Sequence, residues 1–149
     1  MMLNQNKEIL LVEDNPDDVE LTRIAFAEAG SGYVIRVVTD GAQAVDYILA
    51  RGEYAGRDAS DLPALVLLDL NLPKLNGREV LQAIRDNPAS RALPVVVLTT
   101  SAEPMDVGSV YELGANSYIQ KPVEFERFVD VVRQIGLYWL VLNQPPNQP

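Results

Sequence analysis

Polar side chains stand at the ends of four of the five short apolar runs in this sequence. Glu13 and Asp14 follow the first run, Asp69 follows the third, and Thr99 and Lys121 follow the last two. Carboxylates that are forced together repel one another, and a hard divalent cation with oxygen ligands relieves that repulsion. If these side chains converge, they place a magnesium ion beside a lysine, which is a site for a phosphoryl group.

The apolar runs have the composition of strands in a parallel sheet. Four of them lack polar alternation, which is typical of strands covered on both faces, whereas the second carries Arg36 and is expected at the sheet edge. The carboxyl ends of such strands meet along one edge, where ligands of this architecture bind, so the polar residues should converge there. The predicted strands are residues 9–12, 33–38, 65–68, 95–98 and the weaker 117–119.

Helical patterns follow each of these runs. Asn15 offers an N-cap before Pro16 at the first helical position, and Asn76 with Glu79 has the capping-box spacing. Five strand–helix repeats predict a doubly wound α/β fold, in which five helices cover both faces of a five-stranded parallel sheet. The helices are predicted from Pro16 to Gly30, from Asp40-Gly41 through Leu49, from Asn76 to Pro88, from about Pro104 to Leu113 and from near Glu124 to about Leu140.

The composition excludes several kinds of chemistry. The chain has no Cys and no His, so disulfides, thiolate or imidazole metal sites and phosphohistidine are excluded. Its 12 basic and 21 acidic side chains give a formal net charge of −9, which argues against nucleic acid and anionic lipid as partners. No apolar stretch approaches the length of a membrane span, and the N-terminus lacks the pattern of a secretory signal. We therefore expect a cytoplasmic protein.

The length of 149 residues corresponds to one ordinary domain. We predict a single folded unit over residues 1–142 and a flexible tail over residues 143–149. The one long connection, GEYAGRDASDLP at residues 52–63, is polar and rich in turn residues, so it is expected to be an exposed loop.

Each of the polar residues also has a simpler explanation when it is considered alone. A single acid at a strand end is most often a helix N-cap or a solvated loop residue, and Asp14 or Asp40 could be one. Lys121-Pro122 could be no more than the exit of a strand. Polar residues of the right kind at four separate strand ends favour a functional site over four unrelated coincidences.

Four segments together resemble the receiver domain of two-component response regulators. They are LLVEDNPDD at 10–18, LLDLNLPKLNG at 67–77, VVVLTTS at 95–101 and GANSYIQKP at 114–122, and the resemblance covers about residues 7–140. It implies a flavodoxin-like sheet with the strand order 2-1-3-4-5. Three further features resemble those of the response regulators paired with cyanobacterial and bacterial phytochromes. They are the 52–63 insertion, TTS at 99–101 and the ending YWLVLNQPP at 138–146.

The resemblance implies a role for each acidic residue. Asp69 corresponds to the phosphoacceptor, which attacks the phosphohistidine of a sensor histidine kinase and forms an acyl phosphate. Asp14 corresponds to the principal ligand of one Mg²⁺, Glu13 is the second member of the acidic pair, and Asn71 supplies a backbone carbonyl to the ion. The partner kinase is expected to be a bacteriophytochrome-type photoreceptor, and the output a protein–protein contact.

The resemblance also implies how the signal is passed on. Lys121 pairs with a phosphate oxygen, and a cis bond to Pro122 is expected to aim it into the site. The Thr99 hydroxyl turns toward the new phosphoryl group, and the Tyr118 ring rotates inward behind it. Thr100 is bulkier than the residue usually found beside this switch threonine, so the lifetime of the acyl phosphate is left open.

Three other functions compete with this one. A phosphohydrolase of the haloacid dehalogenase type also uses an Asp nucleophile and magnesium, but it needs a second Asp where this chain has Asn71. A flavodoxin-like mononucleotide binder needs a glycine- or hydroxyl-rich loop where this chain has Asp17 and Asp18. A degenerate receiver that acts as a phosphorylation-independent binding module is the better rival, and the complete set of site residues counts against it.

The end of the fifth predicted helix is apolar on two faces. Phe125, Phe128, Val132, Ile135 and Trp139 recur at helical spacing, and this stripe is enough to dock the helix on the sheet. Outside the stripe, Tyr138, Val141 and Leu142 predict a two-fold homodimer in which each fifth helix meets its own copy. The alternative is that the tail folds back over the surface of its own domain.

Overall fold

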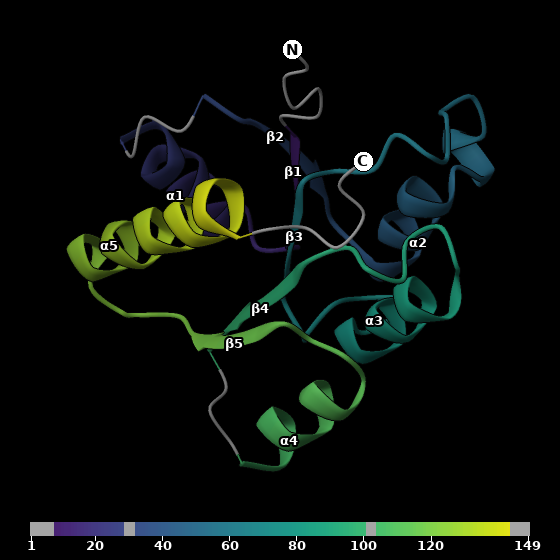
Figure 1. Cartoon of the computed structure of the whole chain (residues 1–149). Coiled ribbons are helices and arrows are strands. Elements are labelled where there is room, and N and C mark those ends of the chain that lie inside the picture. The colour runs from purple at the N-terminus through teal and green to yellow at the C-terminus, as the bar shows by residue number, and fades with distance from the viewer. Residues whose placement is uncertain (1–7, 29–31, 101–103, 144–149) are drawn as a thin grey trace.

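The computed structural model describes residues 8–28, 32–100 and 104–143 of the chain. In this part, five strands form one parallel sheet in the order β2-β1-β3-β4-β5, and the predicted topology is therefore confirmed (Figure 1). β2 lies at the sheet edge, as its mixed composition indicates. The strands are β1 (Glu8–Val12), β2 (Val34–Val38), β3 (Leu65–Leu68), β4 (Val95–Thr99) and β5 (Ser117–Gln120).

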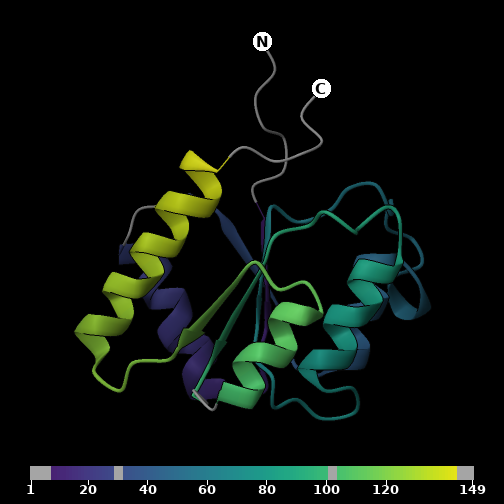
Figure 2. The same cartoon turned by 60° about the horizontal axis from the view of Figure 1, so that its bottom comes forward.

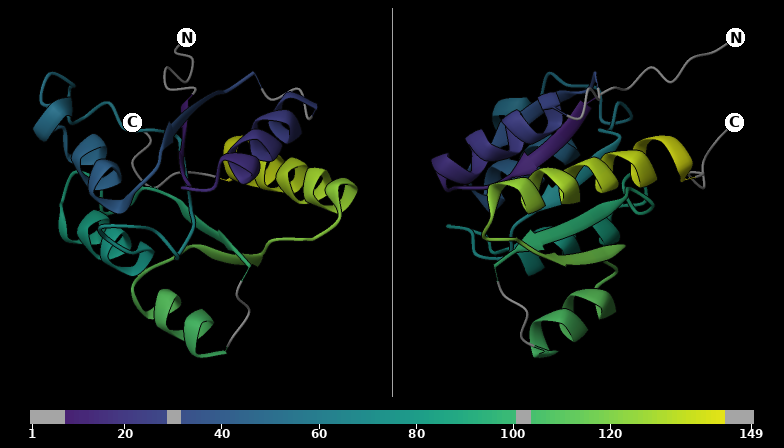
Figure 3. Two further views of the ribbon diagram at one scale, coloured as in Figure 1. Left: turned by 180° about the vertical axis from the view of Figure 1, so that it is seen from behind. Right: turned by 90° about the vertical axis from the view of Figure 1, so that its left-hand side faces the viewer.

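Helices cover both faces of the sheet, as predicted from the strand–helix repeats. In the described residues, two helices contribute to the hydrophobic core on one face and three to the core on the other, and Figure 2 looks along these layers. The pair also lies side by side when the molecule is seen from behind (Figure 3), in agreement with its contacts. The pair is α1 (Pro16–Glu28) and α5 (Phe125–Gly136), and the three are α2 (Gly41–Leu49), α3 (Gly77–Asp86) and α4 (Pro104–Glu112).

The sheet separates two hydrophobic cores because successive residues of a strand point to opposite faces. In β1, Leu10 and Val12 pack in the core that α2, α3 and α4 complete, whereas Ile9 and Leu11 pack in the core under α1 and α5. All four side chains are at most 3% exposed. Burial on both faces explains why these strands are continuous apolar runs in the sequence.

The helices that begin at the carboxyl edge of the sheet are capped by the predicted side chains. The Asn76 side chain accepts a hydrogen bond from the Glu79 amide at 3.0 Å, and the Glu79 carboxylate accepts one from the Asn76 amide at 3.0 Å. The Asn15 side chain accepts a hydrogen bond from the Asp17 amide at 2.9 Å. These caps fix where α3 and α1 start, and with them the loops that carry the site.

The fifth helix differs from its prediction in two respects. Its regular part ends at Gly136, and residues Leu137–Leu142 continue it as a π-helical turn. Phe128, Val132 and Ile135 of the predicted docking stripe are buried, but Val129 at 6% exposure joins them in the core and Phe125 is 40% exposed. Both Phe125 and Val129 are compatible with helical spacing, so the sequence pattern alone chose wrongly between them.

The long connection between α2 and β3 is largely exposed, as predicted, and it starts with a 3-10 turn at Gly52–Tyr54. Arg57 anchors it, because its guanidinium donates hydrogen bonds to the carbonyl oxygens of Tyr47 and Asp61. The same guanidinium lies 4.0 Å from the centroid of the Tyr47 ring, within cation–π distance. This connection is therefore fastened to α2.

Two predictions about chain ends fall beyond the described residues. The stop of the first helix at Gly30 lies in the undescribed range 29–31, and the predicted tail at 143–149 lies outside the description except for Asn143. Within the ranges that are described, the helices are too short or too polar to cross a membrane.

Candidate functional site

The carboxyl ends of four strands bring the predicted polar residues to one edge of the sheet. Backbone hydrogen bonds extend the ladder into the acidic residues, because the Glu13 amide donates to Val38 and the Asp69 amide donates to Val12, each at 3.1 Å. Beyond β4, the Lys121 amide donates to the Thr99 carbonyl at 2.7 Å. The sheet itself thus sets the positions of these residues.

Three carboxylates form a compact cluster at this edge. Glu13, Asp14 and Asp69 each offer an oxygen, and these oxygens lie within 4.8 Å of one another. Glu13 is buried, Asp14 is exposed, and the Asp69 side chain is 12% exposed. An all-oxygen donor set that is open on one side suits a hard divalent cation, which keeps some water ligands. The residues present therefore fit a divalent metal ion.

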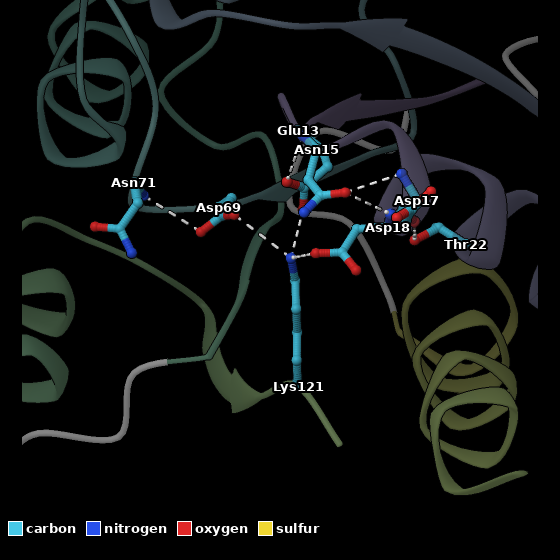
Figure 4. A network of polar contacts seen from close by, with 8 residues as sticks. All are labelled: Glu13, Asn15, Asp17, Asp18, Thr22, Asp69, Asn71 and Lys121. Atoms are coloured by element: carbon cyan, nitrogen blue, oxygen red, sulfur yellow. Dashed lines mark hydrogen bonds and ion pairs between the residues drawn. The ribbon is translucent and has the colours of Figure 1, made fainter. Parts of the chain in front are cut away.

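Lys121 reaches the cluster from the end of β5 (Figure 4). Its Nζ lies 2.5 Å from a Glu13 oxygen, 2.9 Å from an Asp18 oxygen and 3.4 Å from an Asp69 oxygen, and its side chain is 8% exposed. Burial alone lowers the pKa of this ammonium, but the hydrogen bonds to Glu13 and Asp18 and the charges of Glu13 and Asp69 together outweigh burial and raise the pKa above its usual value. The lysine therefore stays charged.

The Lys121–Pro122 peptide bond is not cis, contrary to the prediction. Throughout the described residues, all peptide bonds are trans. Lys121 nevertheless reaches the acidic cluster, because β5 pairs with β4 in parallel register and Gln120 lies opposite Thr99. The direction of the strand is enough to place the ammonium at the site.

The cluster carries more negative than positive charge. Burial raises the pKa of Glu13 to about 7, although the hydrogen bond and the charge of Lys121 act in the opposite direction. The nearby charge of Asp69 also raises the pKa of Glu13. A single ammonium does not compensate the surrounding carboxylates, and a bound cation would relieve the excess.

The backbone around Asp69 is held tightly. An Asp69 oxygen accepts a hydrogen bond from the Asn71 amide at 3.3 Å. Gly77 begins α3 directly beside this turn, and a Cβ atom at Gly77 would lie 2.6 Å from the Asp69 carbonyl oxygen and 2.7 Å from the Leu70 Cα. Only glycine permits this close approach, so the glycine at the start of α3 is required for the geometry of the Asp69 turn.

Thr99 has an unusual environment for a hydroxyl group. Its side chain is fully buried, and its Oγ1 has no hydrogen-bond partner among the residues that the structure describes. A buried hydroxyl without a partner costs about 1–3 kcal/mol. The Thr99 hydroxyl at the site is therefore an unused donor, and it could donate a hydrogen bond to a ligand oxygen.

Tyr118 and Thr100 occupy the surroundings of Thr99. Tyr118 lies opposite Val97 in the β4–β5 register, and its partly buried ring packs against the core formed with α2, α3 and α4. Its backbone amide donates to the Tyr111 hydroxyl at 3.1 Å. The Thr100 side chain is exposed, and the Thr100 carbonyl accepts a hydrogen bond from Gln120 at 3.2 Å.

Sequence reasoning missed Asp18 as a member of this site. Asp17 and Asp18 both stand in the first turn of α1, where the helix N-terminus alone is enough to favour an acidic side chain. The structure gives Asp18 a second role, because its carboxylate lies on the Lys121 ammonium (Figure 4). The signal available in the sequence was an acid in the first turn of a helix that starts at the carboxyl edge of the sheet.

Comparison with known families and proteins agrees with this geometry. Residues 9–133 match the response regulator receiver domain family. The chain is 44% identical over 139 residues to the probable methanogenesis regulatory protein FilR2 of Methanothrix harundinacea, covering 93% of this chain and 87% of that protein. It is 40% identical over 137 residues to the response regulator Rcp1 of Synechocystis, covering 92% of this chain and 91% of that protein.

Solved structures resemble this one over nearly the whole chain. The phosphorylated cyanobacterial phytochrome response regulator RcpA has a TM-score of 0.87 at 39% identity, covering 95% of this chain and 99% of that one. The Mn²⁺-bound form of Rcp1 has a TM-score of 0.85 at 38% identity, with 94% and 99% covered. The bacteriophytochrome response regulator RtBRR has a TM-score of 0.76 at 48% identity, with 96% and 86% covered.

Proposed function

This chain belongs to the response regulator receiver domain family, and on that premise we propose that Asp69 is its phosphoacceptor. The donor is the phosphohistidine of a sensor histidine kinase. The observation that carries the proposal is the convergence of Asp69 with an acidic cluster and a buried lysine, Lys121, at one edge of the sheet. That combination supplies a nucleophile, a cation site and a fixed positive charge for phosphoryl transfer.

The reaction is a displacement at phosphorus. An Asp69 carboxylate oxygen attacks the phosphorus atom, the new O–P bond forms, and the P–N bond to the imidazole of the kinase breaks. The imidazole leaves with the electron pair of the P–N bond and takes up a proton. Lys121 lies 3.4 Å from Asp69 and is held charged, so it can pair with a phosphoryl oxygen. The receiver itself thus catalyses transfer to its own carboxylate.

One Mg²⁺ is the proposed cofactor. Glu13, Asp14 and Asp69 would hold it with carboxylate oxygens, and Asn71 would add its backbone carbonyl. Bound there, the ion neutralises negative charge on the phosphoryl oxygens. The fit of the oxygen cluster to a hard cation and the Mn²⁺-bound form of the similar protein Rcp1 support this assignment. Self-catalysed dephosphorylation would use the same ion.

Thr99 and Tyr118 are the proposed switch. The buried Thr99 hydroxyl lacks a partner among the described residues, so a phosphoryl oxygen on Asp69 offers it one. A move of Thr99 toward Asp69 frees space next to β5, where the partly buried Tyr118 ring can turn inward. If the two conformations differ in free energy by only a few kcal/mol, a covalent phosphoryl group can shift the equilibrium between them.

The complete site also bears on the competing functions. A degenerate receiver need not keep a nucleophile, an acidic pair and a lysine together, as Asp69, Glu13 and Lys121 are here. A phosphohydrolase of the haloacid dehalogenase type needs a carboxylic acid two residues after its nucleophile, where this chain has Asn71. We therefore favour a phosphoacceptor with signalling output.

The proposed partner is a bacteriophytochrome-type sensor histidine kinase in the cytoplasm. Response regulators named for phytochromes or bacteriophytochromes are 39% and 48% identical to this chain. The acidic net charge of −9 favours a protein target over nucleic acid for the output. The surface for that output is the face of α4, β5 and α5 beside Tyr118.

A two-fold homodimer through the end of the fifth helix is also proposed. Tyr138, Val141 and Leu142 are 50%, 69% and 60% exposed, and Leu137 beside them is 54% exposed. These apolar side chains belong to the π-helical turn Leu137–Leu142. A contiguous exposed apolar patch of this kind is usually covered in solution, and a second copy offers a self-complementary cover.

Incubation with acetyl phosphate and Mg²⁺ tests the phosphoacceptor assignment. Intact mass should increase by one phosphoryl group, and removal of Mg²⁺ with EDTA should prevent the increase. Asp69→Asn keeps the shape of the side chain and should abolish labelling, whereas the matched variant Asp58→Asn in the exposed 52–63 loop should label normally. Labelling of Asp69→Asn at the rate of the unaltered protein would refute the assignment.

A further inference from the structure

We propose that Asp18 is a positioning residue that competes with the phosphoryl group on Asp69 for the ammonium of Lys121. The inference rests on the proposed function of Asp69 and adds a residue that sets how favourable the phosphorylated state is. Asp18 does not touch the reacting atoms. It acts through Lys121.

The geometry of Lys121 distinguishes Asp18 from the other acids. Three carboxylates contact the ammonium, from Glu13 at 2.5 Å, Asp18 at 2.9 Å and Asp69 at 3.4 Å. Glu13 and Asp69 belong to the oxygen cluster that fits a metal ion, and Asp18 does not. When a cation binds to Glu13 and Asp69, Asp18 is the one carboxylate of these three whose contact is with Lys121 and not with the cation.

Asp18 is also fixed where it stands. Its backbone amide donates to the Asn15 side chain at 3.3 Å, and its carbonyl accepts a hydrogen bond from the Thr22 hydroxyl at 2.7 Å. Thr22 is 2% exposed, so this bond lies within the packed part of α1. Asp18 therefore holds its place in the first turn of α1, and the flexible partner is Lys121 with its four-carbon side chain.

This arrangement makes Asp18 a rival of the phosphoryl group. In the unphosphorylated protein the Lys121 Nζ lies 2.9 Å from an Asp18 carboxylate oxygen and 3.4 Å from an Asp69 carboxylate oxygen, so Asp18 is the closer of the two. A phosphoryl group on Asp69 offers oxygens that Lys121 must reach by giving up or sharing Asp18. The carboxylate of Asp18 also repels the new negative charge. Both effects act against phosphorylation, so removal of this charge should favour the phosphorylated state.

Asp17 provides a matched control in the same helical turn. Its backbone amide donates to the same Asn15 oxygen, at 2.9 Å, and its side chain is exposed. In the described part of the chain, the hydrogen bonds and ion pairs of Lys121 include Asp18 but not Asp17. A change of one charge at Asp17 therefore alters the helix terminus in the same way and leaves the ammonium untouched.

The test is the affinity for beryllofluoride, a tetrahedral mimic of a phosphoryl group on a carboxylate, measured by calorimetry at a fixed saturating concentration of Mg²⁺. Asp18→Asn should bind beryllofluoride about tenfold more tightly than the unaltered protein, because the variant removes both a rival for the Lys121 ammonium and a repelling charge; tenfold corresponds to about 1.4 kcal/mol. Asp18→Glu restores the charge and should return the affinity to within about twofold of the unaltered protein. Asp17→Asn should also stay within that range.

Two results would overturn the role of Asp18 and leave the proposed function of Asp69 intact. One is an affinity of Asp18→Asn that equals or falls below that of the unaltered protein, and the other is an equal gain in Asp17→Asn. Asp69→Asn separates this failure from failure of the proposed function. If the unaltered protein binds beryllofluoride no better than Asp69→Asn, the phosphoacceptor assignment itself is wrong and the role of Asp18 falls with it. Circular dichroism checks that each variant is folded.

Discussion

The Nζ atom of Lys121 lies 2.5 Å from a carboxylate oxygen of Glu13, and the two residues are separated by 108 positions in the chain. Both side chains are almost completely buried, at 8% and 4% exposure. A buried charge without a partner is strongly destabilising, so Glu13 depends on Lys121, which also contacts Asp18 and Asp69. This pair joins β5 to β1 across the carboxyl edge of the sheet, where the phosphoryl group would enter.

Replacement of Lys121 should therefore destabilise the protein and make it depend on magnesium. Lys121→Met leaves the buried Glu13 without its cation and should lower the free energy of unfolding by about 3 kcal/mol in urea titrations without Mg²⁺. Saturating Mg²⁺ should restore part of this loss. Lys74→Met is the control, because Lys74 lies 3.7 Å from Asp40 and is 70% exposed, and it should cost less than about 1 kcal/mol. Equal losses in both variants would contradict the role of the buried pair.

Magnesium affinity should depend on Asp14 far more than on Asp17. Asp14 belongs to the oxygen cluster, whereas Asp17 stands in the first turn of α1, where the helix dipole alone favours an acid. Asp14→Ala should weaken Mg²⁺ binding by about tenfold or more, and Asp17→Ala by less than about twofold, in calorimetric titrations. Equal weakening would mean that the metal lies nearer the helix than the strand.

The Thr99 hydroxyl should be needed to transmit the signal and dispensable for receiving it. Thr99→Ala removes a hydroxyl that has no partner among the described residues, so its fold should be at least as stable as that of the unaltered protein. Asp69 should still be phosphorylated by acetyl phosphate, but the affinity for the partner should no longer change with phosphorylation. Thr99→Ser restores the hydroxyl and should restore the change. If Thr99→Ala keeps the full difference in partner affinity, the proposed relay is wrong.

Charged residues at the end of the fifth helix should abolish dimerisation. The double variant Tyr138→Lys and Leu142→Lys places two like charges in the exposed apolar turn, and it should sediment as a monomer. Val34→Lys, which changes an equally apolar residue of 63% exposure on β2, should leave a dimer intact. Sedimentation of the unaltered protein as a monomer at tens of micromolar, with and without phosphorylation, would rule out the dimer.

The strand order came from the resemblance to receiver domains, whereas the apolar runs themselves were sufficient for the edge at which the polar residues meet. Strands buried on both faces leave continuous apolar runs, and parallel strands must present their carboxyl ends together, so Glu13 and Asp69 could be placed without any contact being known. The caps at Asn15 and Asn76 were also predictable, because a cap involves residues within one helical turn.

The features that were missed depend on contacts between residues far apart in the sequence, or on a choice between two residues that fit the helical pattern equally well. The Asp18 ion pair joins residues 103 positions apart, and nothing local to Asp18 distinguishes it from Asp17. Phe125 and Val129 both suit a helix face, and the packing of α5 against α1 decided for Val129. The trans Lys121–Pro122 bond was missed because a Lys-Pro pair is compatible with either isomer.

The most direct test of the account is the chemical identity of the phosphorylated residue. After incubation with acetyl phosphate and Mg²⁺, sodium borohydride reduces an acyl phosphate on aspartate to the alcohol, and peptide mass mapping then locates the altered residue. We predict reduction at Asp69 alone, with none in samples from which Mg²⁺ was withheld. Reduction at Asp14 or another acid in place of Asp69, or a phosphoryl group that resists borohydride, would contradict the account.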